Sequence, residues 1–118
     1  MYMGMNFYLV KNRPSIDNGL YIGKSSFGWR FIFYKTSTQD CNKLLNTFEK
    51  WRDYLKETTE TGTHVIMNEY DEIVSYDQLM KLIASKQEED NPDMLKYYEN
   101  VNGYLFFNKE FVEMSKTH

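Results

Sequence analysis

The chain has 118 residues, of which 42% are hydrophobic and 26% charged, and its formal net charge is −3. This length fits one domain, residues 1–118, and the composition argues against intrinsic disorder. No apolar run approaches the roughly 20 residues of a membrane helix, and the N-terminal residues lack the pattern of a signal peptide. The single cysteine, Cys41, excludes an internal disulfide, and together with two histidines it leaves too few ligands for a zinc site. We therefore expect a cytoplasmic protein without a cofactor, a metal ion or a membrane partner.

The charges are unevenly distributed along the chain. Residues 1–56 contain nine Lys and Arg against four Asp and Glu, whereas residues 57–118 contain five against thirteen. A basic half with many aromatic side chains is suited to nucleic acid or phosphate, and an acidic half is suited to a basic protein surface. Ordinary solvated faces are the alternative interpretation.

Three strands are predicted near the N-terminus, over residues 5–10, 20–24 and 27–34. The third alternates bulky aromatic residues with others, and this places four rings on one face of the strand: Phe27, Trp29, Phe31 and Phe33. We expect that face to be part of the core.

The first helix is predicted to begin at a capping motif in residues 37–40, Ser-Thr-Gln-Asp. Large apolar residues follow at helical spacing, namely Leu44, Phe48, Trp51 and Leu55. We expect this helix to cover the sheet, with Trp51 packed inside rather than presented to a ligand.

A short hairpin is predicted next, with strands at residues 64–67 and 72–74. A second capping motif at residues 75–78 begins a helix whose apolar positions are Leu79, Leu82 and Ile83. The hydrophilic segment 88–93, EEDNPD, is predicted to end this helix. Residues 94–100 are predicted to form one or two helical turns, and residues 104–108 are predicted to form a last strand. The resulting fold class is α+β, an antiparallel sheet of N-terminal strands with packed amphipathic helices and a small hairpin.

The most distinctive segment is residues 21–29, with the sequence YIGKSSFGW. It imitates a phosphate-binding P-loop, but Asn18 replaces the required glycine and a predicted strand follows instead of a helix. Four residues remain candidate contacts for the phosphate of a nucleotide or nucleic acid, since glycines let backbone donors approach an anion: Lys24, Ser25, Ser26 and Arg30. A tight turn between strands is the alternative interpretation.

Two short signatures, Asn6-Phe7-Tyr8 and Tyr21-Ile22-Gly23, resemble those of the GIY-YIG nucleases. The resemblance implies that Tyr8 and Tyr21 lie side by side on paired strands, where a phenolate and a metal ion activate water against a phosphodiester. It further implies that Arg30 contacts the phosphate and that Glu49 holds magnesium. The family arginine normally lies on a helix, whereas Arg30 falls in a predicted strand, and no family motif surrounds Glu49.

Residues 21–29 and the acidic segment 68–73, NEYDEI, resemble parts of small uncharacterised tailed-phage proteins with an (H/Y)IGKSSxGW core. Many of those proteins carry a close cysteine pair that this chain lacks, so a metal site suspected for them does not transfer. The resemblance implies a phage accessory protein and supplies no activity.

We therefore expect a non-enzymatic phage protein that binds a host macromolecule in the host cytoplasm, for example as an inhibitor of a defence or regulatory factor. Its predicted contact surface is acidic and consists of Glu69, Asp71, Glu72, Glu88, Glu89 and Asp90. A GIY-YIG-like metal-dependent nuclease and a nucleotide-binding or nucleic-acid-binding protein are the alternatives. Acidic residues in the hairpin turn also fit a simple solvated turn.

The abundance of rings near the C-terminus leads to a prediction about assembly. Five side chains are expected to include exposed aromatic rings: Tyr34, Tyr97, Tyr98, Phe106 and Phe107. Because contiguous exposed rings usually mark an interface, they predict a homodimer or an obligate partner. Packing of these rings within one monomer is the alternative.

Overall fold

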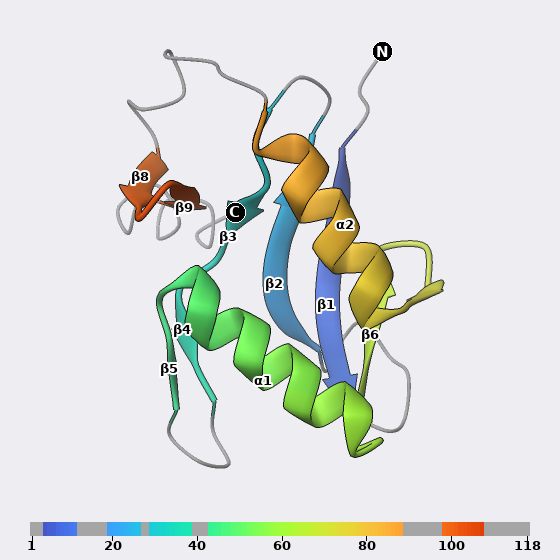
Figure 1. Cartoon of the computed structure of the whole chain (residues 1–118). Coiled ribbons are helices and arrows are strands. Elements are labelled where there is room, and N and C mark those ends of the chain that lie inside the picture. The colour runs from blue at the N-terminus through green and yellow to red at the C-terminus, as the bar shows by residue number, and fades with distance from the viewer. Residues whose placement is uncertain (1–3, 12–18, 27–28, 39–42, 89–97, 108–118) are drawn as a thin grey trace, which may run out of the picture.

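The computed structural model describes residues 4–11, 19–26, 29–38, 43–88 and 98–107 of the chain. They form a seven-stranded mixed sheet with two helices, together with a separate two-stranded sheet (Figure 1). The predicted α+β class is confirmed. Neither helix of these residues has the length and apolar character of a membrane span.

The large sheet has the strand order β7-β6-β1-β2-β3-β9-β8. Its strands are β1 (Met5–Lys11), β2 (Leu20–Ser25), β3 (Ile32–Phe33), β6 (His64–Asn68), β7 (Ile73–Val74), β8 (Tyr98–Val101) and β9 (Tyr104–Phe107). Every neighbouring pair is antiparallel except β3 and β9, which run parallel. The predicted antiparallel arrangement therefore holds apart from that one pair.

Both helices, α1 (Phe48–Glu60) and α2 (Tyr76–Lys86), lie on the same side of the sheet (Figure 1). We call this side the helix face. Its core joins alternate strand residues such as Phe7 and Leu9 to Trp51 and Leu55 of α1, and all four are almost fully buried. Burial of apolar area contributes about 25 cal/mol per Å², so this cluster is the main source of stability.

The opposite side, which we call the second face, has its own apolar cluster. Its buried members are Ile32, Tyr98, Leu105 and Phe107. Three partly buried rings pack against them, those of Tyr21, Trp29 and Tyr34. The second face is therefore dominated by aromatic side chains, several of which carry a polar group.

The third predicted strand is shorter than expected. Phe31 and Phe33 are fully buried on the helix face, as the alternation predicted, but β3 contains only Ile32 and Phe33. The Trp29 amide donates to the Ser26 carbonyl over 3.2 Å, and this turn breaks the alternation before the strand begins. Trp29 consequently packs on the second face, 6.1 Å from the ring of Tyr98, and its predicted place in the helix-face core is wrong. Phe27 lies outside the described residues.

The predicted start of the first helix is also wrong. Short strands β4 (Thr36–Ser37) and β5 (Leu44–Leu45) pair there, and α1 begins eleven residues later than Ser37, at Phe48, with Thr47 as its N-cap. Thr38 closes the hairpin, because its hydroxyl accepts from the Lys43 amide at 3.0 Å and its own amide donates to the Lys43 carbonyl at 2.8 Å. Residues 39–42 lie outside the described part of the chain.

The apolar stripe of this helix is confirmed from Phe48 onward. Trp51 and Leu55 are fully buried, and Phe48 is partly buried with its ring stacked on Tyr104 at 4.1 Å. Leu44 precedes the helix and is 50% exposed.

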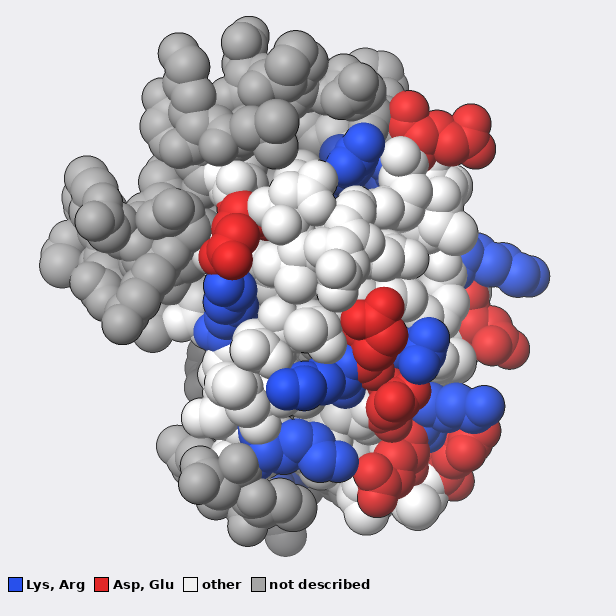
Figure 2. Space-filling model, turned by 60° about the vertical axis from the view of Figure 1, so that its left-hand side comes forward, with Lys and Arg blue, Asp and Glu red and all other residues white. Residues whose placement is uncertain are grey.

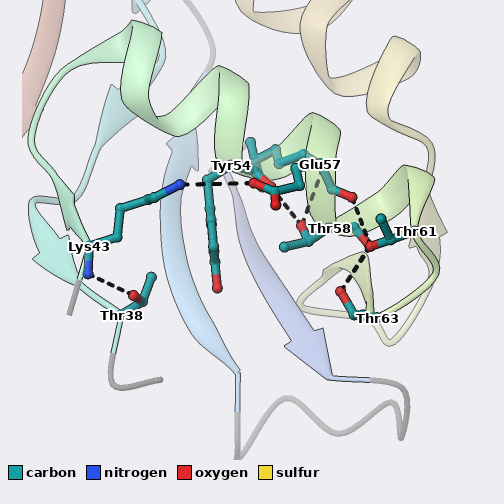
Figure 3. Close-up of polar contacts among 8 residues, drawn as sticks. Thr38, Lys43, Tyr54, Glu57, Thr58, Thr61 and Thr63 are labelled. Carbon is teal, nitrogen blue, oxygen red and sulfur yellow. Dashed lines mark hydrogen bonds and ion pairs between the residues drawn. The ribbon is translucent and has the colours of Figure 1, made fainter. Parts of the chain in front are cut away.

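Threonine hydroxyls satisfy the carbonyl groups at the end of α1 (Figure 3). Thr58 donates to the carbonyl of Tyr54 at 2.8 Å, and Thr61 donates to that of Glu57 at 2.9 Å. Thr63 lies 3.3 Å from the Thr61 hydroxyl and donates to the Thr58 carbonyl. The last turn has no basic residue, and the Thr61 and Thr63 hydroxyls donate to carbonyl groups near the helix end instead.

The second helix begins as predicted. Ser75 accepts from the Gln78 amide at 3.0 Å, and the Gln78 side chain accepts from the Ser75 amide at 2.9 Å, which completes the capping box. The hairpin before it is confirmed too, with Ile66 opposite Val74 and Met67 opposite Ile73.

The C-terminal prediction fails in one respect. Residues 98–101 form strand β8, not the predicted helical turn, while residues 94–97 lie outside the described part. Three of the rings expected at the surface are buried, because the β8–β9 hairpin extends the sheet and places Phe106 in the helix-face cluster and Tyr98 and Phe107 in the second-face cluster. Tyr34 is half-buried, and Tyr97 is not described. The predicted exposed ring cluster is therefore absent from the described residues.

Candidate functional site

The two tyrosines of the nuclease-like signatures meet on the second face. Tyr8 and Tyr21 are cross-strand partners in β1 and β2, and their ring centroids lie 5.4 Å apart. Phe7 and Leu9, on either side of Tyr8, are buried in the helix-face core, so strand alternation directs Tyr8 to the other side. The resemblance thus placed these two residues correctly beside one another.

A chain of hydrogen bonds connects Tyr21 to the β6–β7 turn. The Tyr21 hydroxyl donates to Asn6 Oδ1 at 2.6 Å. Asn6 in turn donates to Glu69 Oε1 from its backbone amide, at 2.8 Å, and from Nδ2, at 3.0 Å. Glu69, predicted as part of an external contact surface, is therefore fixed against the sheet by residues that lie far from it in the sequence.

The environment of Tyr8 opposes ionisation of its hydroxyl. Partial burial raises the pKa of the Tyr8 phenol above its ordinary value, and the nearby Glu69 carboxylate raises it further. At neutral pH the side chain is a neutral hydroxyl. It suits hydrogen bonding and ring stacking, not the role of a phenolate base.

Lys24 provides a cation on the same face. It is the cross-strand partner of both Asn6 and Ile32, and its Nζ lies 5.8 Å from the centre of the Phe107 ring. Burial lowers the pKa of the Lys24 ammonium. A cation above an aromatic ring in a partly desolvated position is well placed to meet an anion.

The other predicted anion contacts do not join Lys24. Ser25 is buried, and alternation directs its side chain to the helix face. The Ser26 carbonyl accepts from Lys86 Nζ at 3.2 Å, and Arg30 Nη1 donates to the Gly103 carbonyl at 3.4 Å. Among the four, Lys24 alone lies beside the tyrosine pair.

The predicted nuclease residues are not brought together either. Glu49 is exposed in the first turn of α1, on the helix face, whereas Tyr8 and Tyr21 point to the second face. Within the described residues no group of three or more His, Cys, Asp and Glu side chains is placed to hold a metal ion. The tyrosine pair therefore stands without the carboxylate that the resemblance assigned to magnesium.

The predicted acidic surface divides into two parts. Asp71 and Glu72 are exposed in the turn between β6 and β7, whereas Glu88 follows the far end of α2. An eleven-residue helix spans about 16 Å, so these groups do not form one continuous patch. Glu89 and Asp90 lie outside the described residues. On the face shown in Figure 2, acidic and basic side chains are interspersed and do not separate into two regions.

Asn68, which the sequence interpretation overlooked, shapes the turn. Its buried Oδ1 accepts from the amides of Tyr70, at 2.9 Å, and Glu72, at 3.1 Å, while its Nδ2 donates to Glu72 Oε1 at 2.8 Å. Asp71 takes a left-handed conformation with φ of 62°, which Asp tolerates better than most residues. An Asn at the start of a tight turn is the signal that would have identified this role.

Tyr70 and Ile73 are the most exposed large apolar side chains among the described residues, at 63% and 64%. Ile73 also borders a cleft of about 290 Å³ between the end of α1, strands β6 and β7, and the start of α2. Its lining combines apolar and polar groups: Thr59, Glu60, His64, Val65, Ile66, Ile73, Val74, Ser75 and Tyr76. The exposure of Tyr70 and Ile73 could not be predicted from the sequence, since Ile73 follows an ordinary strand pattern.

Comparisons with known proteins give no match, whether to a family model, a curated protein or a solved structure.

Proposed function

We propose that the protein acts by binding another protein through the exposed turn formed by residues 69–73, which we call the acidic turn. The observation that carries this proposal is the exposure of Tyr70 and Ile73 among Asp71 and Glu72. Large apolar side chains in the centre of a charged rim are typical of interaction surfaces, and tyrosine is enriched at the residues that dominate binding energy.

The construction of the acidic turn supports this role. The hydrogen bonds of Asn68 hold its backbone, and Glu69 is tied to Asn6 on the neighbouring strand β1. A surface that is already ordered loses little conformational entropy when it binds. The exposed side chains are therefore presented in advance of any partner.

The chemistry of the neighbouring cleft favours a basic partner. Partial burial raises the pKa of Tyr76 in the cleft wall; the cation of Arg52 opposes this effect, and the carboxylates of Asp53, Asp77 and Glu60 reinforce it. Asp53 is paired with Arg52 at 3.0 Å, so among the described residues Asp77 and Glu60 supply the unpaired negative field at this wall of the cleft. Such a field speeds encounter with a positively charged surface.

The resemblance to tailed-phage proteins supports a host macromolecule in the bacterial cytoplasm as the partner, for example a defence or regulatory factor that the protein inhibits. The position of Glu49 gives the nuclease alternative no support.

Affinity capture from a bacterial lysate at low and high salt tests the proposal. We expect the chain to retain one stoichiometric protein at low salt and less of it at high salt, because the rim is charged. The double variant Tyr70→Ala with Ile73→Ser should lose that protein. Leu44→Ser is the matched control, since it removes another exposed large side chain, on the β4–β5 hairpin.

Failure to retain any protein at either salt concentration would count against binding as the main role. Equal loss of the partner with the control variant would move the contact away from the acidic turn. Light scattering of the purified chain distinguishes self-association, the predicted homodimer, from capture of a different protein.

A further inference from the structure

We propose that the second face binds a nucleotide, free or within a single strand, between Lys24, the Tyr8–Tyr21 ring pair and Glu69. The site shares Glu69 with the acidic turn but does not use the exposed side chains of Tyr70 and Ile73, and the inference does not depend on the proposed function.

The topology brings the three groups together. Strand β1 lies between β2 and β6 in the sheet. Asn6 of β1 has Lys24 as its cross-strand partner on one side, and it donates two hydrogen bonds to Glu69, which follows β6, on the other. Tyr8 and Tyr21 form the next pair along the same two strands. A cation, two rings and a carboxylate thus occupy adjoining positions on one face.

Three polar groups of this cluster have bonding capacity left among the described residues. Lys24 Nζ meets the Phe107 ring at 5.8 Å and no described acceptor. The Tyr8 hydroxyl has no described hydrogen-bond partner, and the Glu69 carboxylate uses Oε1 for both bonds from Asn6. Partly buried polar groups without partners favour a ligand that satisfies them.

A nucleotide matches these groups in kind. Its phosphate is an acceptor for the Lys24 ammonium, and its base is a flat ring that stacks on tyrosine. The free oxygen of Glu69 accepts a hydrogen bond from an exocyclic amino group, which adenine, cytosine and guanine have and which thymine and uracil lack. Asn6 separates Lys24 from Glu69, so the phosphate and the carboxylate need not approach each other.

Fluorescence anisotropy with labelled single strands of about eight nucleotides tests this assignment on the full chain. We expect oligo-dA and oligo-dC to bind about tenfold more tightly than oligo-dT, the effect of one hydrogen bond to a charged group. Titration with AMP and UMP, followed by NMR of the ¹⁵N-labelled chain, forms the second arm. Binding of AMP comparable to that of oligo-dA assigns the site to free nucleotides, whereas binding of the strands alone assigns it to single-stranded nucleic acid.

Two substitutions probe the named contacts. Lys24→Gln should weaken binding of oligo-dA about tenfold and reduce its dependence on salt. Lys81→Gln, which removes the same charge from an exposed position on α2, is the matched control and should change affinity little. Glu69→Gln should shift the preference toward oligo-dT, because its amide can donate to the thymine carbonyls.

The wild-type NMR titration keeps the test decisive if a substitution disturbs folding. Shift changes centred on residues 6–8, 21–24 and 69 support the site. Absence of binding by every probe, changes centred elsewhere, or equal weakening by Lys24→Gln and Lys81→Gln would overturn it.

Discussion

Both faces of the sheet carry large side chains, but the two faces differ in chemistry. On the helix face Trp51, Phe31 and Phe33 are fully buried, and the single polar group of this trio, the Trp51 indole, donates to the Tyr34 carbonyl at 2.9 Å. On the second face the rings of Tyr8 and Tyr21 share their space with a carboxylate and a lysine. Apolar packing dominates one face, and polar groups that can meet a ligand gather on the other.

We therefore expect the residues of the helix face to determine stability and those of the second face to determine ligand binding. Substitutions on the helix face should act mainly on the free energy of unfolding. Substitutions on the second face should leave the fold largely intact and alter what the surface binds.

The largest effect is expected for Trp51→Ala. Loss of a fully buried indole and of its hydrogen bond should lower the free energy of unfolding by about 3–5 kcal/mol in urea denaturation. Trp51→Phe, which keeps a ring, should cost less. Tyr8→Ala, on the second face, should cost about 1 kcal/mol. Comparable losses for Trp51→Ala and Tyr8→Ala would contradict the division between the faces.

The next largest effect is expected for Gly23→Ala, which should lower the free energy of unfolding by about 3 kcal/mol. A Cβ at Gly23 would lie 2.1 Å from the Ile32 carbonyl oxygen, so the pairing of β2 with β3 would have to open. Gly62→Ala is the control, because its φ of +78° is strained but nothing lies within 4 Å of the added atom. Its cost of about 1–2 kcal/mol measures backbone strain alone. Equal costs for both alanines in thermal denaturation would exclude the steric explanation.

Asn68→Ala should cost about 2 kcal/mol, since the change leaves the Tyr70 and Glu72 amides without their acceptor. Asn68→Asp retains that acceptor but replaces the donor to the Glu72 carboxylate with a second acidic group, so it should cost less near pH 4, where the new carboxyl is partly protonated, than at pH 7. Urea denaturation at the two pH values measures this. If Asn68→Asp lowers the free energy of unfolding equally at pH 4 and pH 7, the lost donor group of Asn68 matters more than the added charge.

Lys24→Met should raise the free energy of unfolding at pH 7 by less than about 1 kcal/mol. Burial lowers the pKa of Lys24 in the folded chain, so below pH 10.5, where the unfolded lysine is charged, the charged form is disfavoured in the folded state relative to the unfolded state. The same variant should lose nucleotide binding. A clear loss of stability would mean that the lysine contributes to packing more than its charge costs.

Tyr8→Phe should have the smallest effect, with less than about 1 kcal/mol at pH 7. The pKa of Tyr8 in the wild type is raised in the folded state, so the tyrosine of the unfolded chain ionises first as pH rises. The contribution of the neutral Tyr8 phenol to the free energy of unfolding is therefore complete below pH 10.0 and is lost as pH rises through the pKa of the folded state. The variant should therefore lose stability less steeply above pH 10. Identical alkaline unfolding curves for wild type and variant would show that Tyr8 ionises without hindrance.

The features that the sequence predicted well depend on neighbours along the chain. The Ser75–Gln78 capping box and the spacing of Phe48, Trp51 and Leu55 are local patterns, and both are confirmed. The start of α1 was misplaced because the residues around Ser37 satisfy a capping pattern as well as a hairpin, and the pairing of β4 with β5 decides between them. Strand β8 forms for a similar reason, as the partner of β9.

The candidate sites were less accessible to prediction. The pairing of Tyr8 with Tyr21 followed from a family resemblance and is confirmed as geometry. The bond from Asn6 to Glu69 joins residues 63 positions apart, and no local pattern contains it. The role of Asn6 as a link between Lys24 and Glu69 therefore emerges only when β1 is placed between its neighbours.

The parallel seam between β3 and β9 has a consequence for synthesis on the ribosome. Ile32 and Phe33 pair with Leu105 and Phe106, which a ribosome working at about 5–20 residues per second adds some 4–15 seconds later. Strands β1, β2 and β6 are made before β9 and can pair first, while the outer edge of β3 has no strand to pair with. The nascent chain therefore passes through a stage in which the edge of β3 is unpaired and can bind a chaperone or a neighbouring nascent chain.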